Sequence, residues 1–168
     1  MREETETPPD PVVRSERSRR TVAALALVFA WGVVFRAALV PRPRPGRFWD
    51  TESYVRYARQ WASGGLPHLD ARTPGYPLLL LAAGTPIPRA RRVVRAQRGL
   101  GVACGGLVFV LVLAMTRRRS SATAAGLAAP LLLDLTFMEL VIYSETLGTM
   151  LALAAVTGLA FAAEARRG

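Results

Sequence analysis

The chain has 168 residues, of which 51% are hydrophobic, and a formal net charge of +10. All 22 basic residues are arginines that flank apolar segments, which argues against a nucleic-acid-binding protein and favours membrane phosphates as their counter-charges. Because Cys104 is the only cysteine, an internal disulfide is excluded. The single histidine, His68, cannot form a metal site by itself.

The first apolar segment, Thr21–Val40, has about 20 residues, the length that a helix needs to cross a bilayer. Residues 1–20 are acidic, then proline-rich and then basic, which predicts a disordered tail. The arginines next to the span place this tail in the cytoplasm by the positive-inside rule. Arg36 lies near the outer end of the span, where it either extends to the interface or faces a polar cavity within the bundle.

Residues 41–98 form a long outer segment in which interfacial helices are expected. Tyr54, Tyr57 and Trp61 recur at helical spacing and predict a helix that ends at Gly64–Gly65.

The apolar stretch Tyr76–Ala83 lies within a proline-bounded segment, 74–88. It is too short to span a bilayer, so we expect a helix that lies at, or dips into, the outer interface. If it did cross, the later loops would be inverted. The outer segment is also rich in arginine, against the positive-inside rule. Most of these arginines are expected near lipid headgroups, and one or two are expected to hold a lipid phosphate.

Three further spans are predicted, at about 99–116, 122–142 and 147–163. Glycines at the start of the first of these indicate close helix packing. With the N-terminus inside, four spans bring the Arg117–Arg119 loop and the C-terminal arginines to the cytoplasmic side as well. Residues 21–168 are therefore expected to be one all-α membrane domain, a polytopic transmembrane helix bundle of about four spans with interfacial helices in its first outer loop.

Three acids are predicted on the outer side of this bundle. Asp50 and Glu52 follow the first span, and Glu145 lies at the junction of the last two. Carboxylates in a half-desolvated site can act as a general base or bind a divalent metal, although paired acids in loops are usually solvated. Asp134 and Glu139 fall within the predicted third span, where a charge is costly and therefore marks a candidate functional residue.

The ordered features are a first span, an outer loop with Asp50, RTPGYPLLLLAAG, VVRAQRGLG and the acidic junction YSETL. Together they resemble the N-terminal part of the C-type multi-span glycosyltransferases, which include protein O-mannosyltransferases and the aminoarabinose transferases that act on lipid A. The resemblance extends over nearly all of residues 21–164. It implies that Asp50 is the catalytic acid. Glu52 is similar to the second acid of the mannosyltransferase Asp-Glu pair, but Thr51 separates the two acids here.

The candidate substrate-binding residues are Tyr54, Arg95, Gln97 and Glu145. The resemblance implies that Arg95 lies near the donor phosphate and that Glu145 corresponds to an acid at the outer end of the third span. Neither a cofactor nor a metal is expected.

The function that the resemblance implies is the N-terminal membrane module of a glycosyltransferase with a polyprenyl-phosphate-linked sugar donor. Family members have more spans, so the chain is expected to be truncated or one part of a split enzyme. Its expected location is the inner (plasma) membrane. The expected partners are the lipid-linked donor, membrane lipids and a second membrane subunit, and not nucleic acid.

Two alternatives remain. The first is a small non-enzymatic polytopic scaffold or assembly subunit, whose acids and arginines pair with one another. The second is a small transporter, which fits less well because transporters carry their substrate residues near mid-membrane and only Asp134 lies there.

Overall fold

The computed structural model describes residues 11–39, 51–65, 74–84, 90–141 and 144–166. These residues are helical and contain no strand, in agreement with the predicted all-α class. The elements in chain order are α1 (Pro11–Leu39), α2 (Thr51–Ala62), α3 (Gly75–Ala82), α4 (Ala90–Thr116), α5 (Arg119–Ala128), the 3₁₀ turn η2 (Ala129–Leu131), α6 (Leu133–Met138) and α7 (Glu145–Ala165).

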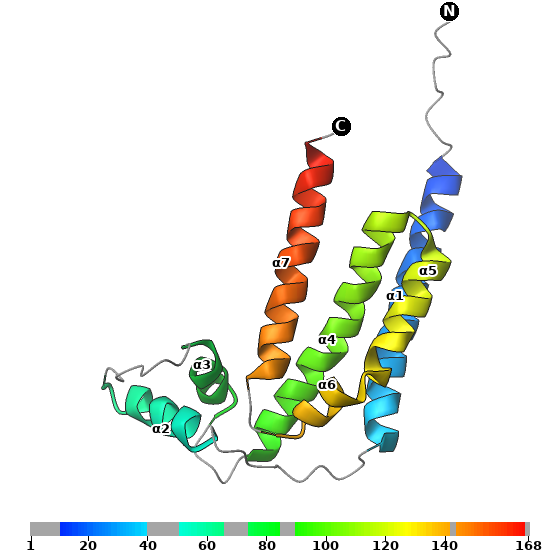
Figure 1. The fold of residues 1–168 in the computed structure, drawn as a ribbon. Helices are drawn as coiled ribbons and strands as arrows, with labels where there is room; N and C mark the ends of the chain where they lie inside the picture. The colour runs from blue at the N-terminus through cyan, green and yellow to red at the C-terminus, as the bar shows by residue number, and fades with distance from the viewer. Residues whose placement is uncertain (1–10, 40–50, 66–73, 85–89, 142–143, 167–168) are drawn as a thin grey trace, which may run out of the picture.

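Three long helices form the frame of the molecule, with α4 between α1 and α7 (Figure 1). Among the described residues, the helices long and apolar enough to cross a membrane are Ser15–Leu39, Arg91–Thr116 and Glu145–Ala165. Large side chains remain exposed along them, including Leu159 at 70%. Such faces suit lipid rather than water, so the chain is a membrane protein by length and composition.

Small residues allow the helices around α4 to approach closely. A Cβ atom on Gly106 of α4 would lie only 2.7 Å from the ring of Phe29 on α1. The predicted close packing is therefore confirmed at Gly106, whereas Gly99 at the start of the segment has open space around it. A buried cluster between α1, α4 and α5 contains Val28, Phe109 and Ala122.

Helix α1 begins earlier than its predicted span. Residues 11–20, predicted to belong to a disordered tail, are helical from Pro11 onward. Proline is favoured in the first turn of a helix, and an ion pair between Glu16 and Arg20 at i,i+4 spacing supports the following turns. Residues 1–10 of the predicted tail lie outside the described residues.

Helix α4 also begins earlier, at Ala90 instead of Gly99. Its first turns are amphipathic, because Val93, Val94 and Gln97 are buried while three arginines of the same turns are exposed. The arginines interrupt the apolar sequence, so these turns were not predicted as part of the span, although their 3.6-residue period is a helix signal.

The predicted third span, 122–142, is not one continuous helix. It is divided into α5, η2 and α6, and the break lies at Pro130. Proline removes a backbone donor and clashes with the preceding turn. Side chains bind two carbonyls near the break, since Trp31 Nε1 donates to Leu127 O at 3.0 Å and Thr136 Oγ1 donates to Pro130 O at 3.0 Å. The number of crossings stays a prediction.

The two short helices expected in the outer segment are present. Helix α2 contains the aromatic series and ends before Gly64, whose φ of +79° suits glycine. Helix α3 has 8 residues and includes Tyr76–Ala82 of the short apolar stretch. Both pack beside the first turns of α4 and α7, at the lower left of Figure 1.

The three basic clusters meet at the other end of the bundle. The start of α1, the turn between α4 and α5 and the end of α7 lie together there (Figure 1). The arrangement agrees with the predicted common side for these arginines. We call this end the basic end, and the end that carries α2 and α3 the acidic end, after the exposed Glu52 and Glu145.

Candidate functional site

The candidate site is built at the acidic end, where α2 and α3 contact the first turn of α7. The hydroxyl of Tyr54 on α2 lies 3.0 Å from the hydroxyl of Ser144, which precedes α7. The ring of Tyr54 packs edge-to-face on that of Tyr76 in α3, with 4.9 Å between the ring centroids. Three segments that are far apart in the chain therefore converge on Tyr54, which is 4% exposed.

A compact hydrophobic cluster fixes this arrangement. Val55 and Ala58 on α2 and Leu80 on α3 are buried together with Val93 on α4, and Leu147 of α7 packs against them. Burying a large apolar side chain contributes roughly 1.5–3 kcal/mol, so such a cluster can hold two short helices on the bundle. The opposite face of α2 is polar and exposed, as its sequence pattern predicts.

Two of the predicted acids are exposed at adjoining helix starts. Glu52 lies in the first turn of α2, and Glu145 is the first residue of α7. Because Tyr54 contacts Ser144, the two turns that carry these acids adjoin. Carboxylates are favoured at such positions by the partial positive charge of a helix N-terminus.

Asp50, the predicted catalytic acid, lies outside the described residues. Its neighbour in the chain is Thr51, the first residue of α2, which is buried. The start of α2 is thus anchored directly after this acid.

Arg95 and Gln97, which are close in the sequence, have different environments. Arg95 is exposed, and its Nε donates to the carbonyl oxygen of Arg91 at 3.4 Å. Gln97 is fully buried, and its Nε2 donates to the carbonyl oxygen of Val141 at 2.9 Å. Gln97 therefore ties α4 to the segment that leads into α7, whereas Arg95 remains accessible to a ligand.

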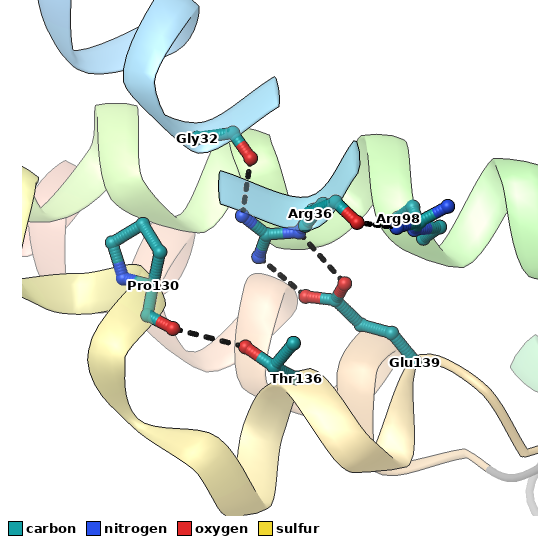
Figure 2. A network of polar contacts seen from close by, with 6 residues as sticks. All are labelled: Gly32, Arg36, Arg98, Pro130, Thr136 and Glu139. Carbon is teal, nitrogen blue, oxygen red and sulfur yellow. Dashed lines mark hydrogen bonds and ion pairs between the residues drawn. The ribbon is translucent and has the colours of Figure 1, made fainter. Parts of the chain in front are cut away.

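A buried ion pair lies on the neighbouring part of the acidic end (Figure 2). Arg36 of α1 and Glu139, which follows α6, are 3% and 0% exposed. Arg36 Nε donates to Glu139 Oε2 at 2.7 Å, and Nη2 donates to the second carboxylate oxygen, so the pair is bidentate. Of the two predicted environments for Arg36, the structure shows the interior one.

Backbone groups complete the surroundings of this pair. Arg36 Nη1 donates to the carbonyl oxygen of Gly32 at 3.1 Å, and the guanidinium of Arg98 donates to the carbonyl oxygen of Arg36. Gly101 of α4 lies against the pair, since a Cβ atom there would overlap the Glu139 carboxylate and the Arg36 guanidinium. The pair therefore requires glycine at this point of α4.

This specific pairing was not predicted from the sequence. Arg36 and Glu139 are 103 residues apart, and each was weighed separately as a charge in an apolar segment. The sequence does contain an indirect signal for the pair, because both charges lie near the outer ends of predicted spans and therefore at a similar depth in the membrane. Opposite charges at equal depth in one bundle are expected to pair.

The chemical capacity of the acidic end lies in its exposed charges. Glu52 and Glu145 can accept protons or hydrogen bonds, and Arg95 can hold an anion. In the part of the chain that the structure describes, no three His, Cys, Asp or Glu side chains gather into a group that could hold a metal ion.

No protein-family model, no curated protein and no solved structure matches this chain.

Proposed function

We propose that the chain is the N-terminal membrane module of a glycosyltransferase that takes its sugar from a polyprenyl phosphate. The observation that supports this most is the docking of α2 and α3 on the start of α7 through Tyr54 and Ser144. It places exposed Glu52 and Glu145 on adjoining helix starts, at the end of the bundle where a lipid-linked donor would present its sugar. The motifs of the sequence resemblance fall in the same region.

In this proposal each exposed residue has a distinct role. Asp50, with Glu52 two residues further along the chain, accepts the proton of the acceptor hydroxyl as the glycosyl bond forms. Arg95 binds the phosphate that leaves the sugar and stabilises its charge. Tyr54 and Gln97, both buried, hold α2 and the segment before α7 in place. A second membrane subunit is the proposed source of further elements of the acceptor site.

The catalytic role is tested in the membranes of the source organism, because these hold the native donor and partners. The chromosomal gene is altered to encode Asp50→Asn, and the membrane glycoconjugates are compared with those of a strain that lacks the gene. We expect the same glycan to be missing from both strains while the D50N chain remains at its normal level. Arg59→Gln, an exposed change near the end of α2, is the matched control and should leave that glycan intact.

Two outcomes would contradict the catalytic role of Asp50. If the D50N strain and the deletion strain both keep all glycans of the parent, the proposal is wrong. If the D50N chain is lost from the membrane, Asp50 has a structural role and the scaffold alternative gains.

Donor binding is tested separately with a photoactivatable polyprenyl phosphate. In membranes that contain the full chain, Arg95→Gln should lower crosslinking about fivefold or more, since one phosphate contact is lost. Arg92→Gln, an exposed arginine of the same helix, is the control and should crosslink normally. Equal crosslinking of R95Q and the unaltered chain would contradict the role of Arg95.

The scaffold alternative has a specific observation in its favour. Charges of the bundle pair with one another: Arg36 pairs with Glu139 in the interior, and Arg117 pairs with Glu164 at the surface. In a scaffold, the charged residues would serve to hold the helices together through these pairs. The scaffold alternative predicts that disrupting the pairs changes partner assembly, and that D50N changes no glycan even if it lowers the amount of chain in the membrane.

A further inference from the structure

A pocket of about 470 Å³ opens at the basic end, between the start of α1, the end of α4 and the end of α7. Its lining includes Arg17, Arg117 and Glu164. These residues lie at or next to the ends of all three candidate membrane spans. If those helices cross a bilayer, the pocket is at the level of the lipid headgroups of one leaflet.

The lining of the pocket has an apolar part and a charged part. Leu113 and Phe161 belong to its apolar part, whereas its charged part has three arginines, Arg17, Arg117 and Arg119, against one acid. Phe161 is 49% exposed in the bundle, so this apolar wall is accessible to a ligand. An arginine-rich rim over an apolar wall complements an amphiphile with an anionic head.

Arg117 has an unusual backbone for an arginine. It follows the last residue of α4 with a φ of +56°, in the left-handed region where helices commonly end on glycine. Its guanidinium forms an ion pair with Glu164 of α7, across the pocket. A residue that is costly at this position, with its charge directed toward the pocket lining, suggests a role for the side chain itself.

We propose that this pocket binds an anionic glycerophospholipid. Its phosphate would be held by Arg117 and Arg119, whose guanidinium groups match phosphate in a bidentate manner, and an acyl chain would lie along Leu113 and Phe161. Basic pockets between transmembrane helices recognise lipid headgroups in this way. Glu164 competes with the phosphate for Arg117. The proposal is independent of glycosyl transfer, since the pocket is at the opposite end of the bundle from Glu52 and Glu145.

The test uses the full chain, purified in a neutral detergent and titrated with phosphatidylglycerol, phosphatidylcholine or inorganic phosphate. Bound lipid is counted by native mass spectrometry. We expect phosphatidylglycerol to bind about fivefold or more tightly than phosphatidylcholine, because each basic contact to an anionic lipid contributes about 1 kcal/mol. Inorganic phosphate should not displace the lipid, since it lacks the acyl chains.

Three variants assign the binding to the pocket. Arg117→Gly removes the charge but suits the left-handed backbone, so a weaker affinity for phosphatidylglycerol cannot be ascribed to lost folding. Arg118→Gln is the matched control, because Arg118 is exposed, adjacent in the chain and not part of the pocket lining. Glu164→Gln should strengthen binding, since it frees Arg117. We expect about a fivefold loss in R117G and no change in R118Q.

Each opposite result overturns the proposal. Equal affinity for the two lipids would show an apolar groove without headgroup selection. Displacement by inorganic phosphate would show a phosphate site that needs no lipid. Equal losses in R117G and R118Q would show attraction to a basic surface instead of a pocket.

Discussion

At the scale of single residues, the buried pair of Arg36 and Glu139 dominates the acidic end. Removing two charges from a polar environment is costly, and their attraction offsets this cost only with good geometry and further hydrogen bonds. The bidentate contact and the carbonyl of Gly32 supply both. The pair therefore fixes the segment after α6 against α1.

Loss of one partner should be strongly destabilising. Glu139→Gln leaves the Arg36 guanidinium buried without a counter-charge, which should lower the free energy of unfolding by about 3–5 kcal/mol. The double change Arg36→Met with Glu139→Leu removes both charges and should cost far less. Thermal unfolding in a mild detergent measures both. Equal midpoints for E139Q and the unaltered chain would contradict the burial of the pair.

The close approach of α4 to this pair gives a second prediction. Gly101→Ala places a methyl group against Glu139 and Arg36, which should destabilise the bundle by about 1–3 kcal/mol through overpacking. Gly99→Ala is the matched control on the same helix, because a Cβ atom there meets nothing within 4 Å. Alanine has the higher helix propensity, so G99A should be neutral or stabilising. Similar effects of the two changes on the unfolding midpoint would count against this packing.

At the scale of elements, the docking of α2 and α3 combines an apolar cluster with a polar contact between Tyr54 and Ser144. Tyr54→Phe and Ser144→Ala each remove the contact between the two hydroxyls, and each should cost about 1 kcal/mol. The double variant should cost less than the sum of the two, because the same interaction is lost in all three. Limited trypsin digestion at Arg56 and Arg59 reports on the docking. Strict additivity would show that the contact contributes nothing.

Some of the helices could be predicted from the sequence and others could not. Apolar length was enough to predict the cores of α1, α4 and α7, and aromatic spacing was enough to predict α2. The division at Pro130 was not predicted, because the flanking residues are apolar enough to be read as one span. The early start of α4 was not predicted either, since its arginines interrupt the apolar pattern although Val93 and Val94 are buried.

The candidate site was predictable only in part. The pattern of apolar segments predicted that Glu52 and Glu145 lie outside the spans, and both are exposed at helix starts. Burial of Gln97 against Val141 and the pairing of Arg36 with Glu139 join segments that are 44 and 103 residues apart. Such contacts depend on how the helices pack, and a single sequence gives no direct signal for them.

At the scale of the whole molecule, the exposed candidate acids and the arginine-lined pocket lie at opposite ends of the bundle, although the acidic end also carries arginines such as Arg91, Arg92 and Arg95. The acidic end carries α2, α3, Glu52 and Glu145, and the basic end gathers Arg17, Arg117 and Arg119 around one pocket. Arginines next to spans and in the short turn after α4 are expected on the cytoplasmic side, whereas the long segment 41–98 is only weakly governed by the positive-inside rule. The acidic end would then lie on the outer side. The proposed glycosyl transfer depends on this orientation, whereas the proposed lipid pocket requires only that the helices cross the bilayer.

A topology map tests the frame most directly. Reporters that are active only on one side of the membrane are fused after residues 60, 118 and 145 of the chain. We expect the fusions after 60 and 145 to report the outer side and the fusion after 118 to report the cytoplasm. A fusion after 118 that reports the outer side would contradict this orientation, because the basic end, and not the end with Glu52 and Glu145, would then face outward.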